Sequence, residues 1–169
     1  MSVSLFDMSI PVLVHGLTNL SALLDKAAAH CETKKIEPAA FLQARLFPDM
    51  LPLTRQVQIA CDTSKGAAAR LAGIDSPKHE DNETTFAELH ARIAKTIDFV
   101  KTVTAERMHG AESRTIVLKF PTNTLTFTGL SYVNAFVLPN LYFHITVAYA
   151  LLRQGGVELG KRDFLGKIQ

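Results

Sequence analysis

The stretch VNAFVLPNLYFHITVAYALL, residues 133–152, decides the fold of this chain. Its apolar residues recur at three- and four-residue spacing, which is typical of the buried face of an α-helix. They are Val133, Phe136, Val137, Leu141, Val147, Ala148, Leu151 and Leu152. The pattern predicts a long core helix from about Leu130 to the pair Gly155–Gly156, where glycine suits a helix end.

Three more segments share this periodicity and, with the stretch above, predict a four-helix bundle. They span Ser4–Thr33, Met50–Ala72 and Thr85–Arg107. Pro11 removes a backbone hydrogen bond and clashes with the preceding turn, so we expect a kink or a late helix start near Met8. Asp49 is placed to cap the second helix, because its side-chain oxygen can accept from an unpaired N–H of the first turn. The fold class is therefore mainly α.

The connections between these helices follow other patterns. A short helical turn is expected at Pro38–Phe47, and Asp75–Thr84 is a polar linker. Thr115–Phe120 and Leu125–Thr128 are rich in β-branched and apolar residues, which predicts a small β-hairpin or an irregular flap before the last helix. This long connection leaves room for a crossover, so the helices need not alternate in direction. Val157–Gln169 is expected to be an irregular tail.

Composition is that of an ordinary globular protein, and residues 1–169 fit one domain. The net charge is only +2 and the basic residues are scattered, which argues against binding to nucleic acid or to a membrane surface. No segment reaches the roughly 18 consecutive apolar residues of a membrane span. Met1–Ile10 lacks the basic start of a signal peptide. Cys31 and Cys61 lie on apolar stripes, which predicts buried free thiols in a cytoplasmic protein.

Two polar residues interrupt the apolar stripe of the last helix. Asn140 and His144 are four residues apart, so they lie on one helical face. A buried polar group without a partner costs about 1–3 kcal/mol, so both side chains need partners or water. Pro139 cannot donate to the carbonyl of Ala135, which frees an acceptor in the same turn. Two interpretations stay open: a ligand pocket between helices, or a histidine bonded to a neighbouring helix with an asparagine that repairs the proline break.

Three further side chains are candidates for the same pocket. His15 lies beside the apolar face of the first helix and could point at the cavity of His144, or be an ordinary half-buried histidine. Asp49 and Gln56 cluster with Arg45 at the start of the second helix, where a cap paired with Arg45 is the alternative role for Asp49. The candidate pocket residues are Asn140, His144, His15, Asp49 and Gln56.

Several blocks of this sequence resemble the DinB/YfiT-like bundle superfamily, and more closely an uncharacterised bacterial branch of it. They are PNLYFH (139–144), AYALLRQGGV (148–157), FDM (6–8), ARLFPDM (44–50), ARLAG (69–73) and GKRDFLG (160–166). The resemblance covers nearly the whole chain and implies a four-helix bundle that is often a homodimer. Many members hold a divalent metal with three histidines, one early on the second helix and two spaced four apart on the fourth. Some are thiol-dependent transferases or isomerases.

Carried over to this chain, the resemblance implies an incomplete metal site. His144 matches the second histidine of the fourth helix, Asn140 occupies the place of the first, and residues 46–73 contain no histidine. We therefore predict a protein without a cofactor that binds a small ligand or a partner subunit near His144. The alternative is a divergent metal-dependent, thiol-transferase-like enzyme, in which His144 binds nickel or zinc and His15 or Asp49 completes the site.

Overall fold

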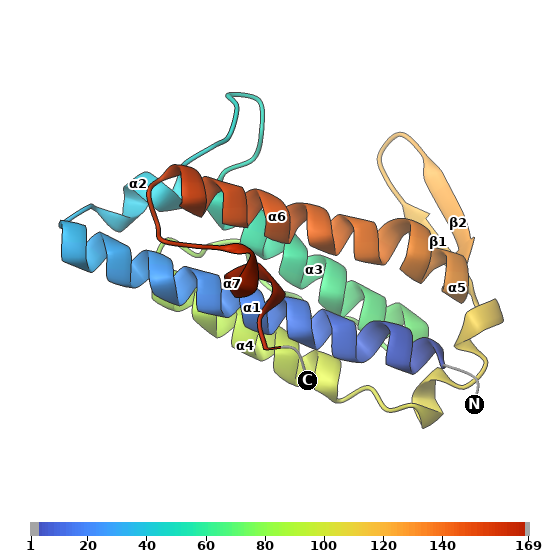
Figure 1. The fold of residues 1–169 in the computed structure, drawn as a ribbon. Helices are drawn as coiled ribbons and strands as arrows, with labels where there is room; N and C mark the ends of the chain where they lie inside the picture. Colours follow the sequence, from blue (N-terminus) through green and yellow to red (C-terminus); the bar gives the residue numbers. More distant parts are fainter. Residues whose placement is uncertain (1–3, 168–169) are drawn as a thin grey trace.

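Four long helices form a bundle in the computed structural model, which describes residues 4–167 (Figure 1). They are α1 (Leu5–Lys34), α3 (Leu53–Ala72), α4 (Phe86–Lys101) and α6 (Leu138–Gln154). Around the bundle the neighbours follow the order α1, α4, α3 and α6. α1 and α6 run in one direction, and α3 and α4 run in the other. The predicted four-helix bundle is confirmed, and its helices do not alternate in direction.

The first helix, α1, begins directly after its N-cap residue, Ser4. The Ser4 hydroxyl accepts from the Asp7 N–H at 3.2 Å, and the Ser4 N–H donates to the Asp7 carboxylate at 3.3 Å. This reciprocal box satisfies donors that have no partner inside the helix. Pro11 is exposed in the second turn, where its ring faces solvent. The expected late start near Met8 is wrong, because the capped first turn already begins at Leu5.

The start of α3 also differs from the prediction. Pro52 is its N-cap and Leu53 its first helical residue. A proline disfavours helical geometry in the residue before it, so Leu51 does not extend the helix backwards. Asp49 therefore lies in the exposed turn before α3, and the predicted capping role of Asp49 is wrong. The short helical turn expected after Pro38 is present as α2 (Pro38–Leu42).

The third helix starts as predicted and ends early. The Thr85 hydroxyl accepts from the Glu88 N–H at 3.2 Å, which confirms the capping box. The helix stops at Lys101, before the predicted end at Arg107. Two short 3₁₀ turns follow, η1 (Glu106–Met108) and η2 (Ala111–Ser113). They carry the chain across the end of the bundle toward the hairpin (Figure 1).

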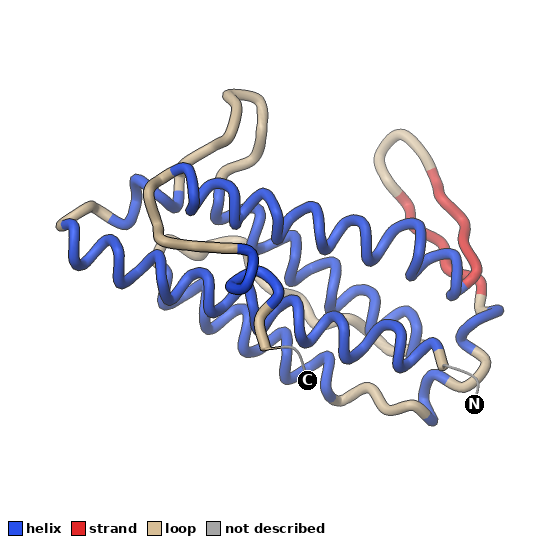
Figure 2. Tube along the Cα trace, viewed as in Figure 1, coloured by secondary structure: helices blue, strands red, loops and turns tan. Residues whose placement is uncertain are grey.

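One buried arginine holds the crossover between α3 and α4. Because these helices run the same way, residues 73–85 return along the bundle (Figure 2). Arg92 Nη1 donates to the Glu83 carboxylate at 2.9 Å. Arg92 Nη2 lies 2.8 Å from the Asp62 carboxylate and 3.0 Å from that of Asp81. The predicted polar linker is therefore tied to both helices by a single guanidinium.

A two-stranded antiparallel hairpin precedes the last helix, as predicted. It consists of β1 (Thr115–Lys119) and β2 (Thr124–Thr128). Ile116 and Leu118 are buried while their neighbours on β1 are exposed. This alternation buries one face of the ribbon and leaves Val117 and Lys119 on its accessible face.

The last helix contains a π-helical turn just before its proline. The helix begins as α5 (Gly129–Tyr132), passes through the π-turn η3 (Val133–Val137) and continues as α6. The Leu138 N–H donates to the carbonyl of Val133, five residues back. Pro139 has no N–H to donate, and the wider turn is where the hydrogen-bond ladder adjusts to that loss. Such turns shift the register of a helix and are frequent at functional sites.

This last helix is apolar enough to cross a membrane by length and composition, but its packing is that of a core helix. An 18-residue window within Gly129–Gln154 has a mean hydropathy of 1.5. Its buried side chains pack against α3 and α1 within the bundle. Asn140 and His144 also place polar groups on its packed side.

The C-terminal tail is not irregular as predicted, because it forms a short helix, α7 (Lys161–Leu165), that docks on α1. Lys26 Nζ lies 2.7 Å from the Asp163 carboxylate. Gly166 has φ +68°, and a Cβ there would sit 2.0 Å from the Asn19 side-chain oxygen. Only glycine therefore allows both the left-handed turn and this close approach.

Candidate ligand site between α3 and α6

Two polar contacts cross the interface between α3 and α6. His144 Nδ1 lies 2.7 Å from Gln56 Oε1, and Asn140 Nδ2 donates to the Thr63 hydroxyl at 3.2 Å. The helices are antiparallel, so the contact of Asn140, which precedes His144 on α6, is to Thr63, which follows Gln56 on α3. The polar pair predicted on the apolar stripe is therefore partnered by α3, and Gln56 is brought to His144 as the sequence suggested.

The hydrogen bonds around Gln56 determine which His144 nitrogen carries the proton. Gln56 Nε2 donates to the carbonyl of Leu51 at 2.9 Å, so Oε1 must face the imidazole as an acceptor. His144 Nδ1–H is then the donor, and Nε2 keeps its lone pair. Burial lowers the pKa of His144 below its ordinary value, which favours the neutral ring. The result is an oriented imidazole whose Nε2 can accept a hydrogen bond.

The orientation of the His144 ring can be tested by replacing its hydrogen-bond partner, Gln56. In Gln56→Glu, a carboxylate would replace the neutral amide oxygen beside Nδ1–H. An adjacent negative charge favours the protonated ring, so the pKa of His144 is expected to rise from its lowered wild-type value. Nitrogen-detected NMR titration would report both the tautomer and the pKa. An unchanged His144 titration in Gln56→Glu would contradict the assigned contact.

A cavity opens one turn away from His144, beside Asn140. We call it the hairpin groove; its volume is about 240 Å³. It is lined by Asp62, Thr63 and Arg70 of α3, by Val117, Leu118, Lys119 and Phe120 of the hairpin, and by Phe136 and Asn140 of the last helix. The π-turn forms part of its wall, because Phe136 belongs to that turn. The cavity thus combines polar groups of two helices and Lys119 of the hairpin with apolar side chains such as Phe120 and Phe136.

Two predicted pocket residues lie elsewhere. His15 Nε2 donates to the carbonyl of Leu165 at 2.8 Å and lines a separate cavity of about 130 Å³, together with Tyr142. This places His15 on the side of α6 that faces α1, whereas His144 faces α3. Asp49 is exposed and makes no polar contact with His144 or Gln56. The structure therefore does not bring His15 and Asp49 to the same site as His144.

The side chains at this site do not fit a divalent metal. Over residues 4–167 no group of three histidine, cysteine, aspartate or glutamate side chains is placed to hold an ion. His144 contributes one imidazole, and the Asn140 amide nitrogen already donates to Thr63. A catalytic first-row metal takes about three protein ligands with an open position. One imidazole with a neutral amide does not meet that requirement.

The two cysteines are buried free thiols, as predicted. Burial raises the pKa of Cys61 to about 12, despite the nearby Thr96 hydroxyl and the Arg92 guanidinium. Burial also raises the pKa of Cys31. Since the thiolate is the reactive form, the raised pKa values favour the unreactive protonated thiols.

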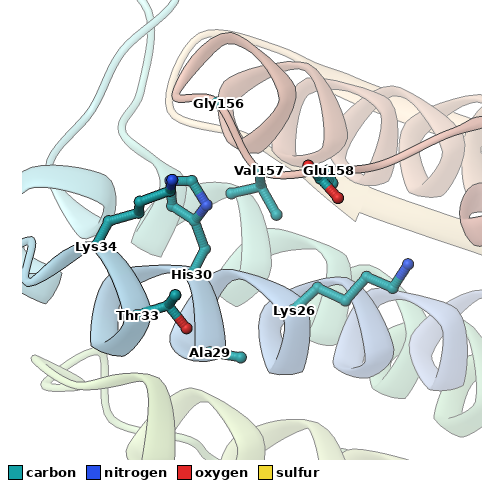
Figure 3. Close-up of a pocket in the computed structure, with 8 residues that line it drawn as sticks. All are labelled: Lys26, Ala29, His30, Thr33, Lys34, Gly156, Val157 and Glu158. Atoms are coloured by element: carbon teal, nitrogen blue, oxygen red, sulfur yellow. The ribbon is translucent and has the colours of Figure 1, made fainter.

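A larger hollow of about 550 Å³ lies between α1 and the segment after α6 (Figure 3). Its charged lining is explained by the fold. Both α1 and α6 end nearby, and a basic side chain such as Lys34 offsets the negative end of a helix dipole. Lys26 is already paired with Asp163, and Glu158 supplies an opposing charge on the facing segment. We therefore place the candidate site at the hairpin groove.

Among the groove residues, only Asn140 was predicted from the sequence to line a pocket. Thr63 and Arg70 lie seven and fourteen residues after Gln56, so helical spacing places all three near one face of α3. That spacing could have identified them. Lys119 and the other hairpin residues gave no such indication, because only the folded chain places the hairpin over α3 and α6.

Comparisons with known proteins agree with this architecture. Residues 5–165 match the family described as "Domain of unknown function (DUF1993)". The chain is similar to a DinB family member protein from Shewanella denitrificans, known from a crystal structure, with 43% identity and a TM-score of 0.89. That similarity covers 97% of this chain and 93% of the other. No match was found among curated proteins.

Proposed function

Because the chain belongs to the DUF1993 family and has a DinB-like fold, we propose that it binds a small organic ligand in the hairpin groove, without a metal. The observation that carries this proposal is the cavity of about 240 Å³ beside Asn140. Ligand sites are concave, mostly apolar and equipped with a few placed polar groups. The cavity is smaller than the roughly 300–1,000 Å³ of drug-sized sites, so it suits a molecule built around a single ring.

The polar groups of the groove are positioned for recognition. Asn140 donates one N–H to Thr63, which leaves the Asn140 carbonyl oxygen and the Thr63 hydroxyl proton for a ligand. Phe136 and Phe120 lie with ring centroids 6.4 Å apart and supply aromatic surface. His144 lies one turn beyond Asn140 on α6 and is not among the residues that line the groove.

The binding function can be tested by filling the groove from its exposed side. Val117 lines the groove and is 45% exposed, so Val117→Trp would occupy the cavity without disturbing the core. Leu130→Trp is the matched control, since Leu130 is 43% exposed and does not line the groove. A panel of single-ring compounds, followed by NMR chemical-shift mapping, should yield at least one saturable ligand for the wild type. Val117→Trp is expected to weaken it at least tenfold, and Leu130→Trp to leave it unchanged.

Two results would count against this function. If no compound of the panel binds saturably, the proposed binding function loses its support. If Val117→Trp binds a ligand with the affinity of the wild type, the binding site is not the hairpin groove. The metal-dependent alternative makes a separate prediction, namely stoichiometric nickel or zinc that depends on His144. We expect titration with either metal to show no tight site, and His144→Ala to change nothing in that titration.

Association of two copies remains a prediction from the resemblance. Exposed apolar side chains occur near the His144 contact, including Phe143, which is 54% exposed, and Leu51, which is 42% exposed. The Phe143 ring meets His144 edge-on, with centroids 5.2 Å apart. Light scattering at several protein concentrations would detect a homodimer, and a concentration-independent monomer would exclude it.

A further inference from the structure

Two cationic side chains line the hairpin groove without a carboxylate partner of their own. Arg70 comes from α3 and Lys119 from the end of β1. Neither forms an ion pair with any residue between 4 and 167. Their charges are therefore available at the walls of a cavity.

The Arg70 guanidinium is held in place from two sides. Its Nη1 donates to the Tyr132 hydroxyl at 3.1 Å, and Tyr132 is only 1% exposed. Burial raises the pKa of Tyr132, so the phenol stays neutral and does not cancel the arginine charge. The guanidinium also lies against Gly66, where a Cβ would sit 2.5 Å from Nη1. The Arg70 guanidinium has five N–H donors, and Tyr132 accepts from only one nitrogen, so the remaining N–H groups are available to a ligand.

The single carboxylate in the groove lining does not neutralise these cations. Asp62 lies 2.8 Å from Arg92 Nη2 and 3.1 Å from Lys65 Nζ, so two other cations offset its charge. The groove therefore keeps a net positive potential from Arg70 and Lys119. A bidentate arginine contact is the strongest form of carboxylate or phosphate recognition in proteins.

We infer that the ligand of the hairpin groove is a small organic anion. Its carboxylate or phosphate contacts Arg70 and Lys119, and its apolar body packs on Phe120 and Phe136. The Asn140 carbonyl and the Thr63 hydroxyl offer hydrogen bonds to a further polar substituent. This inference rests on the proposed binding function and adds the charge of the ligand to it.

Small aromatic compounds of similar shape but different charge can show whether the groove prefers an anionic ligand. Benzoate and phenyl phosphate carry the anion, and benzamide is the neutral analogue of benzoate. Affinities measured by calorimetry or NMR at low and high salt should favour at least one anion over benzamide by roughly tenfold or more. The preference should shrink as salt screens the charges.

Variants of the chain test the assigned side chains. Arg70→Gln and Lys119→Gln are each expected to weaken the preferred anion by roughly tenfold, while benzamide is unaffected. Lys78→Gln is the control for a lost positive charge, because exposed Lys78 does not line the groove. Gly66→Ala keeps every charge but displaces the Arg70 guanidinium, so it should weaken the anion while leaving the helix folded.

The outcomes distinguish the two proposals. If benzamide binds in the groove as tightly as the anions, the anion inference is overturned and the binding function stands. If an anion binds equally well to wild type, Arg70→Gln and Lys119→Gln, the inference is also overturned. If none of the three probes binds, the anion inference falls, and the broader compound panel with Val117→Trp decides the binding function separately.

Discussion

Replacement of Arg92 by methionine is expected to lower the free energy of unfolding by about 3–5 kcal/mol, the usual cost of removing one partner from a buried ion pair. The Arg92 side chain is 2% exposed and Glu83 is 9% exposed, so the substitution leaves a buried carboxylate without its cation. It also removes one of two cationic partners from Asp62 and from Asp81, which keep Lys65 and Arg55, respectively. Urea denaturation would measure the loss, which should appear as a lower midpoint at an unchanged slope.

The same cluster determines a pH dependence. Burial alone would raise the pKa of Glu83, but hydrogen bonds from Arg92 and Gln58 outweigh burial and hold that pKa below its usual value. Asp81 is also lowered in pKa, because bonds and charges from Arg55 and Arg92 outweigh its burial. A carboxylate with a lowered folded pKa stabilises the protein above its unfolded pKa, and this contribution is lost as the pH falls through the folded pKa. Wild type should therefore lose stability on acidification, and Arg92→Met should lose less.

Two controls show whether the buried arginine itself is responsible. Arg55→Met removes a guanidinium that is 38% exposed and pairs with Asp81 at the surface, so it should cost less than about 1 kcal/mol. Glu83→Gln in the Arg92→Met background removes the stranded charge and should restore part of the stability. A loss below about 1 kcal/mol in Arg92→Met would mean that the clamp does not hold the linker.

Replacement of Gly129 by alanine is expected to cost about 3 kcal/mol, the upper end of ordinary overpacking. A Cβ at Gly129 would lie 1.8 Å from the carbonyl oxygen of Ala111 and 2.9 Å from its carbon. Both are backbone atoms of Ala111, the buried residue of η2, so no flexible side chain can move aside. The start of the last helix would have to shift away from this turn and carry the hairpin end of the groove with it. Thermal or urea unfolding would measure the loss.

Gly160→Ala provides the comparison for Gly129. Its φ is −134°, an extended conformation that alanine adopts, and the nearest atom to an added Cβ is an Asp163 oxygen at 4.0 Å. The cost should stay below about 1 kcal/mol, the range for an unfavourable cap residue. Equal losses at the two positions would refute the steric account of Gly129.

Helical periodicity explains why most of the fold could be predicted. Local rules decide where a chain can be helical, and the Thr85–Glu88 box and the hairpin of residues 115–128 were found because their patterns are contained in neighbouring residues. The errors lie at the ends of helices and in the C-terminal tail, where α7 was not predicted. Asp49 satisfied the composition of a cap, but the restriction that Pro52 imposes on the preceding residue moved the helix start downstream.

Sequence patterns predicted only the part of the candidate site that lies on a single helix, α6. Asn140 and His144 stood out because their spacing places two polar groups on an apolar face. Their partners on α3 required the antiparallel pairing of α3 with α6, which no local pattern specifies. The sequence pattern predicts that His15 lies at the same site, because it borders the apolar face of the first helix. In the structure, packing instead directs His15 to Leu165 and α7.

The four helices, the hairpin and the polar pair are therefore encoded locally, because spacing and capping act between residues close together in the chain. How these parts meet depends on tertiary packing. It placed Gln56 against His144, which sets the tautomer of the imidazole. It also brought Lys119 of the hairpin to the groove that Arg70 lines from α3. Contacts between residues so far apart depend on the packing of whole elements.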